Sequence, residues 1–198
     1  MPELPEVEIT ARLLGEALRG ARIESALAPG INALKTFDPP LSVLAGRTIT
    51  GVRRRAKNLI VEVAEAQQQQ PLVLLIHLMS AGRLQLYDKQ AGPRDRTSRL
   101  LVRVVSESGE PAELRLREFG SKQAAWVKLL LAGELESDEA IAKLGPEAWP
   151  DPPEMGALLD APRPLHPLLR DQRVIAGIGR SWVDEILWHE SMSHFMRV

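Results

Sequence analysis

The start of the chain, Met1-Pro2-Glu3-Leu4-Pro5-Glu6-Val7-Glu8, contains residues that could perform covalent catalysis. Initiator methionine is usually removed before a residue as small as proline, which would leave Pro2 with a free secondary amine. An α-amino group has an ordinary pKa of about 7.7–8.0, so a usable fraction is neutral near pH 7. Such an amine can add to a sugar carbon and form an iminium, with Glu3 as a neighbouring proton carrier. The same residues also fit an ordinary helix start with acids near the dipole's positive end.

Composition excludes several other kinds of chemistry. The chain has 198 residues, is 44% hydrophobic and contains no cysteine, so disulfides, thiolate zinc sites and cysteine nucleophiles are ruled out. No basic segment followed by an apolar run opens the chain, and no run of eighteen apolar residues occurs. We therefore expect a cytoplasmic protein without a membrane partner.

The formal net charge of −1 is an average over unlike segments. Residues 134–160 contain eight acids against Lys143 alone, a net charge of −7, so the remainder carries +6. Much of that excess lies in Arg53-Arg54-Arg55 with Lys57, and in Arg94, Arg96, Arg99 and Arg103. A basic face of this kind suits phosphate, although solvated charge is the alternative.

The elements that must position these residues follow from hydrophobic periodicity. We expect an amphipathic helix from about Pro5 to Leu18, ended by Gly20. Its apolar residues recur three or four apart: Leu4, Val7, Ala11, Leu14 and Leu18.

After a less regular stretch at 33–45, short apolar runs separated by turn residues predict six or so strands. These runs are residues 48–52, 58–63, 72–77, 83–87, 99–105 and 112–116. The glutamine run 67–70 is interpreted as a turn. The pattern predicts an α+β fold, an antiparallel sandwich or barrel flanked by the first helix.

The character of the sequence changes after a strand or short helix at 124–131. We expect a short acidic helix at 134–143, a proline-rich linker at 146–167, and helices at 165–175 and 181–188 joined by residues 176–179. This arrangement could present backbone amides to a phosphate at a helix N-terminus, or could be a simple helical hairpin. The predicted domains are 1–133, a linker at 134–164, and a partial helical domain at 165–198.

Six stretches stand out as an ordered set: Pro2 to Glu8, Arg54 to Lys57, Ile76 to Gly82, Arg117 with Phe119-Gly120, Leu144 to Glu147, and Leu169 to Leu187. Together they resemble the formamidopyrimidine-DNA glycosylase/endonuclease VIII family of base-excision repair enzymes. The resemblance implies an enzyme that flips a damaged base from duplex DNA, at a cost of a few kcal/mol in stacking and pairing. It implies that Pro2 attacks C1′ of the sugar and that the iminium leads to elimination and strand cleavage.

The resemblance also assigns the remaining site residues. Glu3 would shuttle protons, Glu6 would support it, and Lys57 matches a phosphate-contacting lysine, with Arg54 and Arg55 as further DNA contacts. Gly177 and Gly179 match the glycine turn, and Arg180 replaces the family's asparagine, exchanging an amide for a guanidinium.

Arg117 and Phe119 match the residues that fill the gap left by the flipped nucleotide, within an Arg-Arg-Phe run that here is Arg117-Glu118-Phe119. The third such residue is normally Met in a His-Leu-Gly-Met run. Here the ungapped match puts Ser80 at that place and Met79 one place early. A slip of one residue on a strand would turn a side chain to the other face.

Family members usually carry a structural four-cysteine zinc finger near the C-terminus, whereas this sequence reaches Val198 without a cysteine. We therefore expect no cofactor in this chain. The predicted partner is damaged double-stranded DNA, bound by a monomeric, bacterial-type, nucleoid-associated protein. Two alternatives stay open: a non-catalytic module that binds damaged or abasic DNA, and an incomplete fragment of such an enzyme.

Overall fold

The computed structural model describes residues 2–64, 70–92, 95–120, 122–158, 163–193 and 196. Most of the glutamine run and Arg94 of the basic cluster lie outside them. The chain divides into two compact units. The first comprises residues 1–54 and 58–135, and the second comprises residues 55–57 and 136–198.

In the described part of the first unit, two four-stranded sheets form a sandwich, with strand orders β1-β6-β7-β5 and β2-β3-β4-β8. The pairs β1–β6, β6–β7, β5–β7, β3–β4 and β4–β8 are antiparallel. The strands are β1 (Arg22–Leu27), β2 (Ile49–Arg55), β3 (Asn58–Val63), β4 (Leu72–His77), β5 (Gly82–Tyr87), β6 (Ser98–Val105), β7 (Pro111–Glu118) and β8 (Trp126–Leu131).

The apolar pattern of each strand matches its place in the sandwich. Strands β3 and β4 are buried along nearly their whole length, whereas β5 alternates between buried Leu84 and exposed Arg83 and Gln85. A strand with one solvated face shows this alternation of period two. The core of the sandwich includes the side chains of Ile23 and Leu100.

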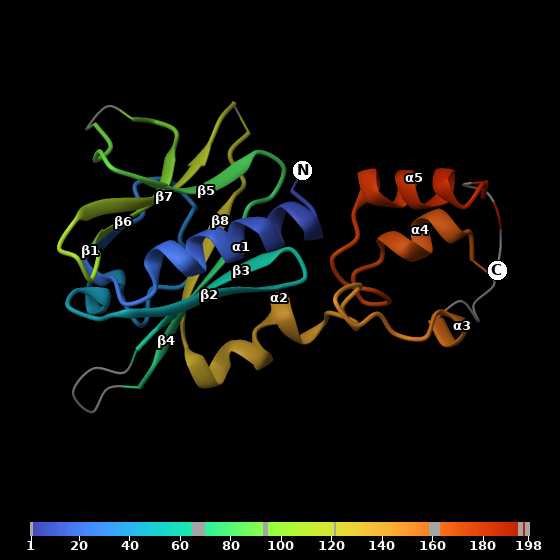
Figure 1. Ribbon diagram of the computed structural model, residues 1–198, viewed down its shortest axis with the longest axis horizontal. Helices are drawn as coiled ribbons and strands as arrows, with labels where there is room; N and C mark the ends of the chain where they lie inside the picture. The colour runs from blue at the N-terminus through green and yellow to red at the C-terminus, as the bar shows by residue number, and fades with distance from the viewer. Residues whose placement is uncertain are drawn as a thin grey trace. The chain divides into compact units, whose positions relative to one another are not determined.

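Helix α1 (Leu4–Leu18) contacts β3 of one sheet and β5 of the other, and Figure 1 shows it lying between them. Its five periodic apolar residues are all buried, as their spacing predicts: Leu4, Val7, Ala11, Leu14 and Leu18. The helix ends shortly before Gly20, whose φ of 77° lies in the left-handed region that glycine adopts after helix C-termini. This packing positions the N-terminus of the chain.

The second unit has a smaller apolar cluster. Its buried members are Leu165, Leu168, Leu169, Ile175, Val183 and Leu187. They come mainly from α4 (Leu165–Arg170) and α5 (Arg180–His189), which lie side by side in Figure 1. Two short helices precede them, α2 (Glu139–Ala142) and α3 (Met155–Leu158).

The α+β sandwich prediction is confirmed, with two differences in the first unit. Strand β1 was not predicted, because its sequence Arg-Ile-Glu-Ser-Ala-Leu has a single fully buried residue, Ile23. The region 33–45 contains a 3-10 helix, η1 (Leu41–Leu44), between cis-Pro39 and Gly46.

Two of the helices predicted after residue 131 are shorter than expected, whereas α5 extends one residue beyond its predicted bounds at each end. The acidic helix is split into a 3-10 helix, η2 (Ala132–Ser137), and α2, because the Asp138 carboxylate accepts a hydrogen bond from the Ala140 amide and starts a new helix there. Helix α4 ends at Arg170 and not near 175, because Asp171 takes an extended conformation. No helix in the described residues is long and apolar enough to cross a membrane.

Candidate DNA-repair active site

The predicted nucleophile lies at the N-terminus of α1. Pro2 is buried, and Glu3, the N-cap residue, is only 2% exposed. The backbone amide of Glu3 donates to the Glu6 carboxylate at 3.0 Å, within a capping box formed by these two glutamates. The capping box that starts α1 therefore also holds the carboxylates of Glu3 and Glu6 near Pro2, so the two interpretations of this stretch, helix start and catalytic group, are compatible.

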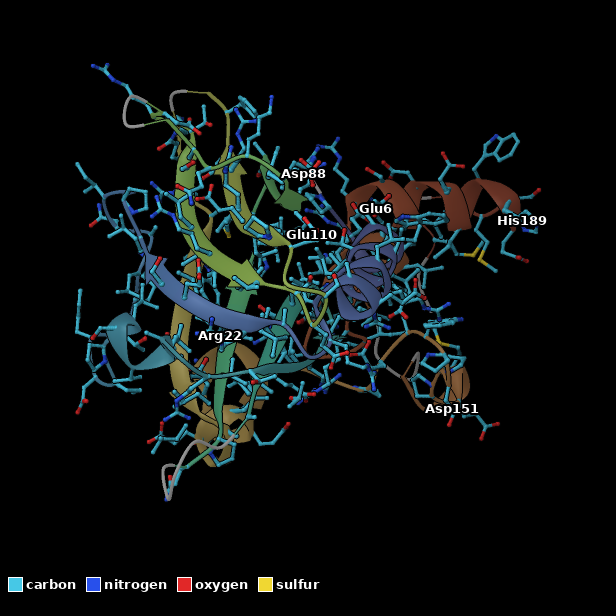
Figure 2. The ribbon with its side chains drawn as sticks, turned by 60° about the vertical axis from the view of Figure 1, so that its left-hand side comes forward. Glu6, Arg22, Asp88, Glu110, Asp151 and His189 are labelled. Atoms are coloured by element: carbon cyan, nitrogen blue, oxygen red, sulfur yellow. The ribbon has the colours of Figure 1, made fainter. Side chains whose placement is uncertain are left out.

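A cavity of about 290 Å³ opens beside Pro2. It is lined by Pro2, Glu6, Thr10, Leu78, Arg83, Leu84 and Gln85, from α1, β5 and the turn before β5. Glu6 is exposed on α1, where Figure 2 labels it. The polar lining offers a carboxylate, a hydroxyl, a guanidinium and an amide, groups that can hydrogen-bond both donors and acceptors of a ligand.

Arg54 and Arg55 both make ion pairs within the protein. Arg54 Nε lies 2.8 Å from the Glu8 carboxylate, and the Arg54 side chain is 5% exposed. In the second unit, the Glu147 carboxylate accepts from Arg55 Nη1 at 2.8 Å and from the Ala56 amide at 2.6 Å. Neither arginine is a solvated charge, and their contact with DNA stays a prediction.

Lys57 belongs to the same turn as Ala56, which has a left-handed φ of 52°. The Lys57 side chain is largely covered, with 9% of its surface exposed. Lysine is rarely buried at this level without a specific role. This burial separates Lys57 from ordinary surface lysines and fits a group held in one place.

The structure brings Arg117 and Phe119 together at the end of β7. The Arg117 guanidinium carbon lies 4.7 Å from the centre of the Phe119 ring, and Phe119 is 53% exposed. Arg117 Nε donates to the Thr97 hydroxyl at 2.9 Å, and the Tyr87 ring lies 5.8 Å from the guanidinium. A positive group and an exposed aromatic ring therefore form one projecting pair.

Asp95 fixes the position of Thr97, whose hydroxyl accepts the hydrogen bond from Arg117. Its carboxylate accepts from the Thr97 hydroxyl and amide and from the Ser98 hydroxyl, at 2.6–2.8 Å. Burial raises the pKa of Asp95, but these hydrogen bonds and the Arg117 charge outweigh it and lower the pKa from 3.8 to about 2. Asp95 is therefore ionised at neutral pH and holds Thr97 in place for Arg117.

The glycine turn of the second unit is held by backbone hydrogen bonds of Ala176 with Pro146 and Ala148, and by the Gln172 side chain. The Gln172 amide group donates to the carbonyls of Arg170 and Ile178, at 3.0 and 2.7 Å, and its oxygen accepts from the Gly177 amide at 3.0 Å. Gly177 has a φ of 105°, which side-chain-bearing residues rarely adopt.

Gly179 is the N-cap residue of α5, and Arg180, the first residue of that helix, is exposed. The positive end of the helix dipole and an exposed guanidinium thus occur together, an arrangement suited to an anion.

Comparison with known proteins agrees with this geometry. Residues 1–122 match the family model described as the formamidopyrimidine-DNA glycosylase N-terminal domain. The chain belongs to the formamidopyrimidine-DNA glycosylase family.

Relatives in the family align with nearly the whole chain. The formamidopyrimidine-DNA glycosylase of Moorella thermoacetica is 35% identical over 197 residues, covering 95% of this chain and 66% of the relative. That of Rhodopseudomonas palustris strain HaA2 is 32% identical, covering 98% of this chain and 68% of the relative. The chain thus spans about two thirds of the length of these curated relatives.

Solved structures of the family share the fold. The Lactococcus lactis enzyme in complex with DNA containing an abasic site superposes with a TM-score of 0.83 at 25% identity, covering 99% of this chain and 70% of that one. A complex of the same enzyme with DNA containing an oxidised pyrimidine gives a TM-score of 0.81 at 26% identity.

The family's His-Leu-Gly-Met run explains the turn after β4. Met79 has a left-handed φ of 49°, the conformation that a glycine at this position adopts easily, and Leu78 O accepts from Gly82 N at 2.8 Å to close the turn. Met79 and Ser80 therefore lie in a turn and not on a strand. Within this turn Met79 is half-buried and Ser80 is exposed, and the ungapped match of Ser80 to the family's methionine stays a prediction.

Two further residues were not assigned roles from the sequence. His77, at the end of β4, stacks on Trp126 with ring centres 5.6 Å apart and accepts from the Met79 amide at 2.9 Å. The sequence feature that could have drawn attention to His77 is its position in residues 76–82, one of the stretches that resemble the family. Glu118 is 1% exposed, and the available signal was its spacing of two and four residues from Leu116 and Leu114, which places it on their buried face of β7.

The residues of this chain do not fit the zinc of the family's C-terminal finger. The sequence has no cysteine, and the described residues contain no group of three or more His, Asp or Glu side chains placed to hold a metal.

Proposed function

We propose that this protein is a DNA glycosylase with apurinic/apyrimidinic lyase activity, which excises oxidised bases from duplex DNA through Pro2. The observation that carries the proposal is the position of Pro2 beside Glu3, Glu6 and an open polar cavity, at the end of a helix fixed by the core. Membership of the formamidopyrimidine-DNA glycosylase family supports the same chemistry.

The proposed reaction begins with the free secondary amine of Pro2. Its lone pair attacks C1′ of the damaged nucleoside, and the bond from C1′ to the base breaks as the base takes up a proton. Glu3 takes up the proton that the Pro2 nitrogen releases on bonding to C1′ and gives it to the ring oxygen of the sugar, which opens the ring and leaves an iminium between Pro2 and C1′. Glu6 supports Glu3 by holding its backbone amide.

The iminium then activates the sugar for strand cleavage. Loss of a proton from C2′ forms a double bond and expels the phosphate on C3′. Water finally hydrolyses the iminium and releases Pro2. Each step requires only proton carriers and water, and the Glu3 carboxylate lies close enough to Pro2 in sequence to serve both proton transfers.

We propose that DNA is held at several phosphate sites along the chain. Lys57, with Arg54 and Arg55 close to it in sequence, would contact the DNA backbone. The N-terminus of α5 at Gly179 and the Arg180 guanidinium would bind another phosphate, while Gly177, whose amide donates to Gln172, shapes the turn before it. Arg117 and Phe119, with Ser80, would enter the space vacated by the flipped nucleotide.

The proposed partner is damaged double-stranded DNA, bound by a monomer in the cytoplasm at the nucleoid. The solved relatives support this substrate class, since they were crystallised with DNA containing an abasic site, a benzylated ring-opened guanine or an oxidised pyrimidine. No zinc is proposed for this chain, because it lacks the cysteine ligands.

Borohydride trapping tests the proposal. Protein with Met1 verified as removed is incubated with duplexes carrying an abasic site, an oxidised purine or an oxidised pyrimidine, and reduction should then link Pro2 covalently to DNA. Pro2→Gly should lower the trapping rate at least about tenfold, because a primary amine lacks the ring that fixes the nucleophile.

A protein with one extra residue before Pro2 is the matched chemical control. Its Pro2 nitrogen is an amide without a free lone pair, so no adduct should form. Absence of an adduct from the unextended protein on all three duplexes would refute the catalytic proposal. Tight, salt-dependent binding to the abasic duplex in that case would identify the non-catalytic binding module instead.

A further inference from the structure

The residue between Arg117 and Phe119 departs most sharply from the family pattern, since an acidic side chain stands where the family has arginine. The neighbours of Glu118 alternate with it across strand β7. Arg117 lies on the face with Tyr87 and Thr97, whereas the Glu118 side chain turns inward and is 1% exposed. The charge reversal therefore does not place a carboxylate on the surface that would meet DNA phosphates.

The buried carboxylate of Glu118 is held by two partners distant in sequence. Its Oε2 accepts from the backbone amide of Ala125 at 2.8 Å and lies 3.7 Å from Nε of buried Arg99. Arg99 also donates to the Ala125 carbonyl, so both main-chain groups of Ala125 are engaged by this pair. A buried carboxylate is tolerated at such a site only when it is paired and hydrogen-bonded.

The backbone of Glu118 is fixed as well. Its amide donates to the Thr97 carbonyl at 2.8 Å, and its carbonyl accepts from the Gln123 side chain at 3.0 Å. The same Gln123 amide group donates to the Arg96 carbonyl at 3.2 Å. Main chain and side chain of Glu118 are thus both held, directly between the two projecting residues.

We propose that Glu118 is a positioning residue, whose ion pair with Arg99 holds Arg117 and Phe119 in the orientation that enters the duplex. The inference rests on the proposed function for its substrate, and concerns insertion into DNA and not the chemistry at Pro2. The Arg99–Glu118 pair thus supports both neighbours from the interior of the sandwich.

The test uses Glu118→Gln in the full chain, with Glu113→Gln as the matched control. Glu113 lies on the same strand, is also 1% exposed, and pairs with Arg115 at 2.6 Å. Both substitutions remove one buried charge from β7, so both should lower thermal stability. Only the change at position 118 acts at the residue between Arg117 and Phe119, whereas Glu113 reaches Arg117 only through Arg115 and Tyr87.

Two readouts separate positioning from stability. The first is the trapping rate on an abasic duplex relative to that on a single-stranded abasic oligonucleotide, which has no base stack to enter. We expect Glu118→Gln to lower this ratio about tenfold, because a misplaced group near the reacting atoms slows a reaction on that scale. Glu113→Gln should leave the ratio unchanged. The second is the fluorescence change of 2-aminopurine next to a stable abasic analogue in a duplex, which reports stacking of Phe119 without requiring catalysis.

Gln123→Ala provides a second variant if Glu118→Gln does not fold, because half-buried Gln123 donates to the Glu118 carbonyl and accepts from Arg99 Nη1 at 3.3 Å, so its removal weakens the support without removing a buried charge. It should shift both readouts in the same direction by a smaller factor. An unchanged ratio and an unchanged fluorescence signal in folded Glu118→Gln or Gln123→Ala would overturn the inference, as would an equal change in Glu113→Gln. Loss of trapping by the unaltered protein on both substrates would instead refute the proposed function, and the aminopurine signal would still decide the role of Glu118.

Discussion

The first unit carries Pro2 at the start of a helix whose apolar face is buried against strands of two sheets. The second unit carries Gly177 and Gly179 on a turn held by hydrogen bonds, from the Gln172 side chain and from the backbone of residues 146 and 148. In the first unit, position is set by a continuous core that extends from Val7 on α1 to Leu129 on β8. In the second, the buried apolar cluster is small, and polar contacts hold the turn.

The contrast shows how each kind of functional group is positioned. A nucleophile must approach one carbon atom with correct geometry, and a close-packed core supplies that precision. Backbone amides that bind a phosphate need a particular turn conformation, and hydrogen bonds to that backbone are sufficient to select it. The two units should therefore respond differently to the same substitution.

The largest effect is expected from removing one leucine from each core. Leu116→Ala, in the first unit, should lower the free energy of unfolding by about 3 kcal/mol, because Leu116 is fully buried on β7, between β5 and β6. Leu168→Ala should destabilise the second unit, leaving trapping on a single-stranded abasic oligonucleotide within about twofold of normal. Denaturant unfolding followed by circular dichroism, together with trapping, measures both. If Leu116→Ala and Leu168→Ala lost single-strand trapping equally, the claim that only the core of the first unit positions Pro2 would be wrong.

An intermediate effect is expected at the glycine turn. Gln172→Ala removes three hydrogen bonds from one side chain and should cost about 2 kcal/mol in the second unit. Affinity for abasic duplex should fall, and the slope of log affinity against log salt should decrease by about one, because one phosphate contact is lost. Fluorescence anisotropy at several salt concentrations measures this, with the exposed Gln90→Ala as control. A Gln172→Ala protein with normal affinity and slope would show that the turn is held by other contacts.

The smallest effect is expected at Asp95, a polar residue of the first unit, because the apolar core supplies most of the stability of that unit. Because the pKa of Asp95 falls from 3.8 to about 2 on folding, its ionised form stabilises the protein above about pH 4, and this contribution is lost as the pH drops toward 2. With solvent screening, Asp95→Asn should cost about 1 kcal/mol at pH 7. The difference in melting temperature from the unaltered protein should shrink between about pH 5 and about pH 2.5.

The exposed Asp88, labelled in Figure 2, gives the matched control, since Asp88→Asn should leave stability unchanged across this range. A difference for Asp95→Asn that stays constant with pH would indicate that the substitution acts through packing and not through charge.

Local periodicity was sufficient for much of the fold. The bounds of β3 and β4 agree with the sequence prediction, and α1 begins one residue earlier than expected. These elements have long, regular apolar patterns, so the side chains that make them are neighbours in the sequence. The short strand β1 lacks such a pattern and forms because β6, which is distant in the chain, pairs with it.

The sequence by itself determined that Pro2, Glu3 and Glu6, the residues of the proposed chemistry, lie together, because they fall within the first turn of a helix. Only the tertiary structure decided the surroundings of Arg117 and Phe119. Glu118 is an internal anchor because Arg99 and Ala125 meet its carboxylate through the packing of the strands. Partners of this kind are fixed by how strands pair and pack, and a local sequence pattern carries no record of that pairing.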